Sequence, residues 1–242
     1  MKSNAVKFRR KMVLASIVGA AASVASAAPY VSTATVGSLS ARAEFDTAGT
    51  NLVVTLTNIS AADVLIPADV LTAVFFDISG GPTLTRVSAT LAPGSTVLFG
   101  PDGGGVVGGE WAYVPDTGVA GLSKYGIGSA GFDIFGPGDM FPGPNLQGPV
   151  GPDGLQYGIT SAGDNPGTGN APVTGGFALI KNSVVFVLSG LPQNFDPSQS
   201  ISNVQFQYGT GLDEPRTPEP SALALLMAGV LYAARRRAGS NA

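Results

Sequence analysis

Glycine and proline constrain the fold of this chain more than any other feature of its sequence. Its 242 residues include 34 glycines and 18 prolines, and both residue types disfavour the interior of a helix. Hydrophobic residues make up 44% of the chain and charged residues 12%, which suffices for a sizeable core. The composition therefore predicts many turns, few long helices and an all-β architecture.

Several segments have the pattern of short strands. In residues 52–58, Leu52, Val54 and Leu56 fall on one face of the expected strand. Residues 181–183 lie between two candidates and form either a hairpin turn or the middle of one long strand. Short strands between turns predict a β-sandwich of jelly-roll or Ig-like type, in which the N-terminal and C-terminal strand groups pair. The further candidates are residues 70–78, 83–91, 96–99, 177–180, 184–188 and 201–208.

A glycine- and proline-rich region, residues 100–176, is inserted between these strand groups. It holds 23 of the glycines and nine of the prolines, so low-complexity disorder is one interpretation. Against disorder, it also holds eight large apolar residues, which flexible linkers rarely carry. We expect ordered loops across one end or edge of the sandwich, with short strands near residues 111–114 and 132–135. The eight residues are Trp111, Tyr113, Tyr125, Phe132, Ile134, Phe135, Phe141 and Tyr157.

One stretch of this region, Gly126 to Gly131, matches the GxGxxG pattern. A dinucleotide site needs a buried strand before the pattern and a helix after it. The sequence offers no buried strand before the pattern. It offers no helix after it either, because residues 136–138 are Gly-Pro-Gly. A glycine-rich turn is therefore predicted here.

The chain contains no cysteine and no histidine. Disulfides, Cys or His nucleophile systems, the Ser-His-Asp triad and the usual zinc and copper ligand sets are all excluded. Carboxylate chemistry is not excluded, since a glycosidase needs only two carboxyl groups about 5–10 Å apart in a cleft.

The N-terminus has the parts of a secretory signal peptide. Five basic residues lie within the first eleven, and an apolar run from Met12 ends in small residues. Ala25 and Ala27 fit the small-x-small cleavage rule, with Ala28 as the first mature residue. An N-terminal membrane anchor is the alternative. The signal implies export through the Sec translocon and cleavage by signal peptidase.

The C-terminus combines three features in a fixed order. Pro218, Glu219 and Pro220 precede an apolar segment, residues 221–234, which an arginine cluster follows. The cluster comprises Arg235, Arg236 and Arg237. The segment is shorter than the roughly 20 residues of a full span, but arginine side chains snorkel and extend its reach. A basic end prefers the cytoplasmic side, which leaves the bulk of the chain outside. An amphipathic or buried helix of a soluble domain is the alternative.

This order closely resembles the PEP-CTERM sorting signal of Gram-negative bacterial surface proteins. The resemblance covers about the last 25 residues and implies processing by an exosortase, a membrane-embedded cysteine transpeptidase-like enzyme. It implies a tail held transiently in the inner membrane as a hydrophobic helix, cut near Pro218–Pro220 and discarded. The protein would then reach the cell surface, often alongside the extracellular polysaccharide of a biofilm matrix. Such tails occur on unrelated proteins, so the resemblance transfers no function to the body.

The charge of the body differs from that of the two ends. Residues 28–217 contain five basic and fifteen acidic side chains, a net charge of −10, whereas the whole chain has −3. An acidic body argues against nucleic acid and anionic membrane surfaces as partners. It favours solubility and is compatible with divalent cations.

Acidic turns recur along the glycine-rich region, at Asp102, Asp116, Asp139, Asp153 and Asp164. Aspartate in a turn usually binds its own backbone. Calcium requires several converging oxygens, and the chain has no D-x-D-x-D-G loop. No cofactor is therefore predicted, and calcium held between distant loops is left open.

Three aromatic residues, Trp111, Tyr113 and Tyr125, are candidates for stacking on sugar rings, with Asp116 or Glu110 as partners for sugar hydroxyls. The alternative, which we favour, is that these rings belong to the core. Asn58 also begins an N-x-S glycosylation pattern, at the end of an expected strand.

The sequence thus divides into four parts. These are a signal peptide (1–27), a β-sandwich ectodomain (28–212), a linker (213–217) and the sorting signal (218–242). The first hypothesis is an exported, non-enzymatic surface or matrix protein. A carbohydrate-binding module for extracellular polysaccharide is second, and a carboxylate hydrolase is third.

Overall fold

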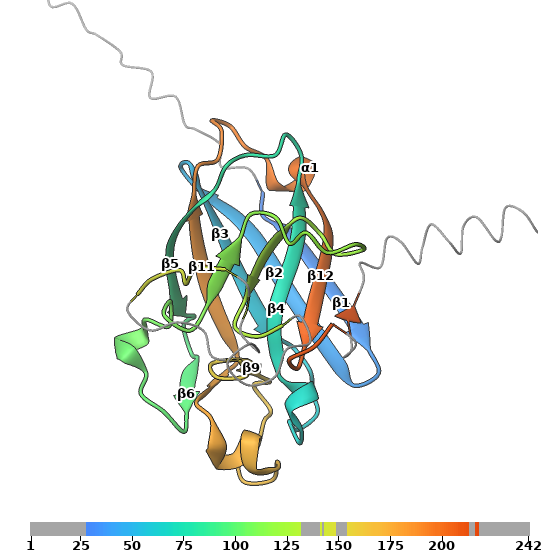
Figure 1. Ribbon diagram of the computed structural model, residues 1–242, viewed down its shortest axis with the longest axis vertical. Coiled ribbons are helices and arrows are strands. Elements are labelled where there is room, and N and C mark those ends of the chain that lie inside the picture. Colours follow the sequence, from blue (N-terminus) through green and yellow to red (C-terminus); the bar gives the residue numbers. More distant parts are fainter. Residues whose placement is uncertain (1–27, 132–140, 142, 149–153, 213–215, 218–242) are drawn as a thin grey trace, which may run out of the picture.

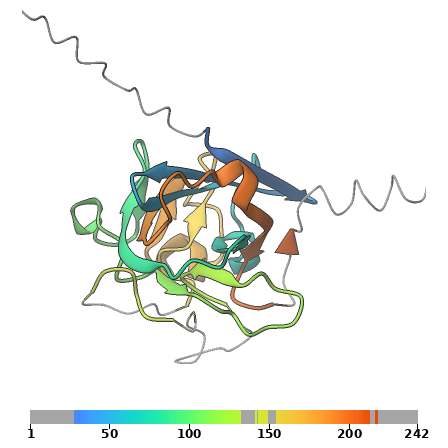
Figure 2. The ribbon, with the colours of Figure 1, turned by 90° about the horizontal axis from the view of Figure 1, so that it is seen from above.

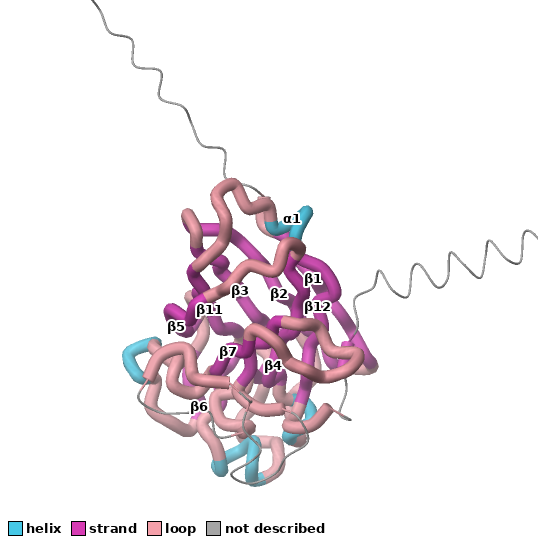
Figure 3. The backbone as a smooth tube through the Cα atoms, turned by 45° about the horizontal axis from the view of Figure 1, so that its top comes forward, coloured by secondary structure: helices cyan, strands magenta, loops and turns pink. Residues whose placement is uncertain are grey.

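The structure, a computed structural model, describes residues 28–131, 141, 143–148, 154–212 and 216–217. These residues form two β-sheets, with helical turns of three to five residues at their margins (Figures 1 and 3). The predicted all-β architecture is confirmed. The expected signal helix and C-terminal hydrophobic helix lie outside the described residues. The helical turns are η1 (Pro67–Asp69), η2 (Gly103–Gly105), η4 (Pro172–Gly176) and α1 (Pro197–Ser200).

The first sheet has five strands, and every neighbouring pair is antiparallel. Burial alternates along β2 and β3, so that Leu52, Val54 and Leu56 are fully buried on one face, as predicted. A sheet with one buried face and one solvated face is typical of antiparallel architecture. In spatial order the strands are β1 (Tyr30–Val36), β2 (Leu39–Ala48), β3 (Asn51–Asn58), β11 (Ser183–Ser189) and β5 (Thr85–Leu91).

The second sheet has eight strands and is irregular. Its β4 pairs with β12 on one side and with β8 and β9 on the other, while β10 runs parallel to β9. Most of β4 is buried, as its nearly continuous apolar sequence predicts. The path is β13 (Arg216–Thr217), β12 (Ile201–Tyr208), β4 (Leu71–Ile78), β9 (Ile159–Thr160), β10 (Leu179–Lys181) and β6 (Thr96–Leu98), with β8 (Tyr125–Gly128) on β4 and β7 (Ala112–Val114) on β8.

Strands from the two ends of the chain pair in both sheets. In the first sheet β11 pairs with β3, and in the second β12 pairs with β4. The predicted pairing of N-terminal and C-terminal strand groups is confirmed. These pairings join residues more than 100 positions apart in the sequence, and such long-range contacts slow folding.

One hydrophobic cluster receives side chains from both sheets. Phe45 of β2 packs edge-on against Phe76 of β4, with ring centroids 5.1 Å apart. Trp111, just before β7, lies 4.8 Å from the ring of Phe186 on β11. Each large side chain buried in this way contributes about 1.5–3 kcal/mol. In Figure 2 the N-terminal strands (blue) and the green part of the glycine-rich region lie on opposite sides of the molecule, with the yellow and gold part between them.

Asn182 carries the chain from one sheet to the other. Strand β10 ends at Lys181 in the second sheet, and β11 begins at Ser183 in the first. The φ angle of Asn182 is 93°, a value that few residues other than glycine and asparagine tolerate. Both predictions for residues 181–183 are therefore wrong, because β10 and β11 neither form a hairpin nor continue as one strand.

Gly126 and Gly128 lie in strand β8, so the predicted glycine-rich turn is wrong at these positions. A Cβ at Gly128 would lie 2.4 Å from a ring carbon of Phe141, and one at Gly126 would lie 2.9 Å from that ring. Phe141 also stacks on Phe75 of β4, with centroids 6.2 Å apart. The glycines are therefore required by the ring that lies over the strand. The strand expected near residues 132–135 lies outside the described residues.

Candidate functional site

The terminal processing residues are placed only up to the edges of the domain. Ala28 is the first described residue and is exposed. Ala25, Ala27, the Pro218–Pro220 motif and the arginine cluster lie outside the described residues. At the C-terminal side, Thr217 pairs with Phe206 in the two-residue strand β13. Residues 216–217, expected in a linker, thus belong to the second sheet, and the sheet extends to the residue before Pro218.

The three candidate sugar-stacking rings are buried. The exposed fractions are 0% for Trp111, 3% for Tyr113 and 2% for Tyr125. The Trp111 indole N–H donates to the Tyr157 carbonyl (3.2 Å), and the Tyr125 hydroxyl donates to the Pro82 carbonyl (3.0 Å). Stacking on a sugar needs an exposed ring face, so the expectation of an exposed platform is corrected. These rings are core residues, which agrees with the alternative favoured above.

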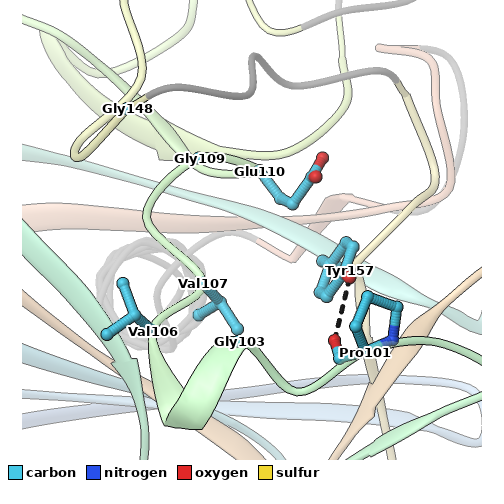
Figure 4. Close-up of a pocket in the computed structure, with 8 residues that line it drawn as sticks. All are labelled: Pro101, Gly103, Val106, Val107, Gly109, Glu110, Gly148 and Tyr157. Atoms are coloured by element: carbon cyan, nitrogen blue, oxygen red, sulfur yellow. Dashed lines mark hydrogen bonds between the residues drawn. The ribbon is translucent and has the colours of Figure 1, made fainter.

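A small pocket lies beside η2, and all the residues that line it belong to the glycine-rich region (Figure 4). Its volume is about 200 Å³, below the roughly 300–1,000 Å³ of pockets that hold drug-sized ligands. The Tyr157 hydroxyl donates to the Pro101 carbonyl across it (3.0 Å). Glu110, half-buried, contributes a carboxylate to the wall. The lining is completed by Gly103, Val106, Val107, Gly109 and Gly148.

Two of the five acidic turns satisfy their own backbone. The Asp102 carboxylate accepts the Gly104 N–H and the Asp116 carboxylate accepts the Gly118 N–H, each at 3.0 Å. Both side chains are exposed and simply close their turns. Asp139 and Asp153 lie outside the described residues.

Asp164 behaves differently, because its carboxylate binds a loop about 100 residues away in the sequence. Its Oδ1 accepts the Val64 N–H (3.2 Å), while the Asp63 Oδ1 accepts the Asn165 N–H (2.7 Å). Each aspartate thus binds the residue that follows the other. The Thr168 hydroxyl donates to the second oxygen of Asp63. We call this group, Asp63, Val64, Asp164, Asn165 and Thr168, the loop clasp.

The carboxyl groups of the loop clasp also interact with each other. The Thr168 hydroxyl, and then the Asn165 N–H, hold the pKa of Asp63 below its usual value. Burial raises the pKa of Asp164, and its contact with the Asp63 carboxyl raises it further. Two carboxyl groups in contact push their pKa values apart in this manner. Sequence reasoning missed Asp63, whose immediate neighbours, residues 61–62 and 64–66, are all apolar.

The remaining candidates give no chemical site. Among the described residues, no group of three or more acidic side chains is placed to hold a metal ion. Asn58 is 1% exposed, and its Nδ2 donates to the Ile159 carbonyl (3.0 Å), so its glycosylation pattern is inaccessible in the folded domain. Within the described part of the chain, no helix is long and apolar enough to cross a membrane.

Comparisons with family models, with curated proteins and with solved structures found no match. Function is therefore inferred from the residues and geometry of this chain alone.

Proposed function

We propose that this protein is exported and sorted by an exosortase through its C-terminal tail, and that it serves at the cell surface or in the extracellular matrix without catalysis. The observation that carries the proposal is the order of Pro218-Glu219-Pro220, an apolar segment and Arg235 to Arg237 at the end of the chain. Prolines on both sides of Glu219 favour an extended backbone that a peptidase can bind.

The position of the tail relative to the fold supports this proposal. The described strands all precede Pro218, and β13 ends at Thr217. Cleavage at the Pro218–Pro220 motif therefore leaves every described strand intact. A removable tail must be separable from the domain in this way, because loss of a core strand would unfold the protein.

We infer that the two sheets form a β-sandwich. Successive strands alternate between the sheets, from β3 to β4, then β5, β6 and later β10, β11 and β12. Buried residues of both sheets share one cluster, with Phe45 against Phe76 and Trp111 against Phe186. These features support two layers packed face to face.

The net charge of residues 28–217, −10, suits a soluble body that does not adhere to nucleic acid or to anionic lipid. The carbohydrate-binding alternative depended on exposed rings at Trp111, Tyr113 and Tyr125. Since these rings are buried, we make no separate proposal of glycan binding.

The test is the intact mass of the protein recovered from the surface of its native host. We expect a mass that begins at Ala28 and ends within Pro218–Pro220, with or without an added glycan or lipid. Replacement of Pro218, Glu219 and Pro220 by alanine should retain the tail in the cell-associated protein. Deletion of residues 238–242, which leaves the motif and the arginines in place, is the matched control and should be processed normally. A wild-type mass that still includes Arg235–Arg237 would refute the proposal and indicate a membrane-tethered domain.

A further inference from the structure

The loop clasp joins two long loops at one end of the molecule. One loop runs from β3 to β4 and contains η1, and the other runs from β9 to β10 and contains η4 (teal and gold at the lower end of Figure 1). Besides the reciprocal aspartate contacts, the Ser161 hydroxyl donates to the Ala62 carbonyl (3.1 Å) and the Asn170 N–H to the Leu65 carbonyl (3.0 Å). Beneath them, Val64 and Val173 are buried in a small apolar cluster. The two aspartates are therefore held in fixed relation by hydrogen bonds around them.

One oxygen of this arrangement lacks a hydrogen-bond donor. Asp164 is 3% exposed, and its Oδ2 is a buried atom with no hydrogen-bond partner among the described residues. The neighbouring side chains are Thr160, which hydrogen-bonds to the Asp164 carboxyl, and Asp63, whose carboxylate oxygens are acceptors like Oδ2 itself. A buried carboxylate oxygen that meets another carboxylate is strongly unfavourable unless a cation lies between them or the two share a proton.

The nearby basic side chain does not supply that charge. The Lys181 ammonium donates to the backbone carbonyl of Asp164 (2.7 Å), not to its carboxylate. The next acidic residue, Asp69, is engaged separately, since its Oδ2 accepts the N–H groups of Leu65 and Ile66. Among the described residues, no basic side chain therefore forms an ion pair with either the Asp63 or the Asp164 carboxylate.

We propose that a divalent cation of the calcium class binds between the Asp63 and Asp164 carboxylates and locks the two loops together. The donors at hand are carboxylate, hydroxyl and carbonyl oxygens, and the chain has no histidine or cysteine, so a hard cation is the match. Two carboxylates are few for calcium, and carbonyls, hydroxyls and water must complete its shell. We expect a dissociation constant of about 10⁻⁴–10⁻³ M, the range of extracellular calcium modules, an expectation that rests on the proposed export.

The experiment measures thermal unfolding and calorimetric binding on the full-length chain, purified in mild detergent and stripped with EDTA. Calcium at 10 mM should raise the unfolding midpoint by about 3–10 °C, and titration should give one site per chain. Asp164→Asn and Asp63→Asn should each abolish both the shift and the heat of binding. Asp102→Asn removes an exposed turn carboxylate elsewhere, with the same change in net charge, and should respond as the wild type does. Both site variants are isosteric, and their circular dichroism spectra establish that they fold.

A wild-type midpoint unchanged by 10 mM calcium, together with the absence of binding heat, would overturn the proposal. If mild acid then stabilises the wild type but not Asp164→Asn, a proton shared by the two carboxyls takes the place of the metal. A calcium response that persists in both site variants would also overturn it, because the ion would then bind elsewhere.

Discussion

A methyl group at Gly128 should destabilise the domain by forcing Phe141 away from strand β8. The Cβ of an alanine there would lie 2.4 and 2.6 Å from two ring carbons of Phe141 and 2.9 Å from the Cβ of Ala73. Real Cβ contacts are essentially never so close, and the Ala73 Cβ is fixed by the backbone of β4, so the ring must move. Overpacking of this kind costs about 1–3 kcal/mol. For a domain of this size, that lowers the unfolding midpoint by roughly 2–12 °C.

The assay is urea unfolding followed through the fluorescence of Trp111, the single tryptophan, which is buried in the native state. Gly148→Ala is the control, because a Cβ at Gly148 meets nothing within 4 Å. In a Phe141→Ala background the cost of Gly128→Ala should shrink, since the ring that it strikes is gone. If Gly128→Ala unfolds at the same urea concentration as the wild type, the proposed reason for glycine in β8 is wrong.

Three other predictions follow from the core and the sheet junction. Phe186→Ala should cost about 3–5 kcal/mol in urea unfolding and shift the native fluorescence of Trp111 to the red, because it opens space beside the indole; an unshifted spectrum would contradict the packing. Burial raises the pKa values of Tyr113 and Tyr208 above their unfolded value of about 10. The free energy of unfolding that these buried, neutral tyrosines contribute is therefore fully present below pH 10 and is lost above it, by up to about 1.4 kcal/mol per pH unit for each tyrosine. A free energy of unfolding that stays constant from pH 9 to 12 would contradict this prediction. Asn58→Ala should cost about 1–3 kcal/mol, since it removes the amide that binds the Ile159 carbonyl and leaves buried backbone groups unsatisfied; differential scanning calorimetry checks this, and an unchanged enthalpy and midpoint would refute a bridging role.

The sequence predicted the strands that carry strong apolar patterns and missed those that do not. Residues 39–48 form β2, yet two of the buried positions on their inner face are Ala41 and Ala43. Alanine has little β propensity and little apolar area, so the alternation is weak in the sequence. Strand β8 was missed for a similar reason, because glycine signals a turn unless a covering ring such as Phe141 is known.

The loop clasp was half visible in the sequence. Asp164 stood out as one of several acidic turns, but nothing distinguished it from Asp102 or Asp116, whose carboxylates bind their own backbone. Its partner Asp63 is 101 residues away and has no local signature. Likewise, composition placed Trp111 in an ordered region without deciding whether its ring is exposed.

The sequence by itself determined the all-β class, the positions of the strongest strands, the absence of thiol and imidazole chemistry, and the order of features on which the sorting proposal depends. These properties are local, since periodicity, composition and short motifs are written in neighbouring residues. Tertiary structure alone decided the crossing between sheets at Asn182, the burial of the aromatic rings and the meeting of Asp63 with Asp164. Burial and charge pairing depend on contacts between residues far apart in the chain, and no local pattern encodes which distant segment will cover a ring or face a carboxylate.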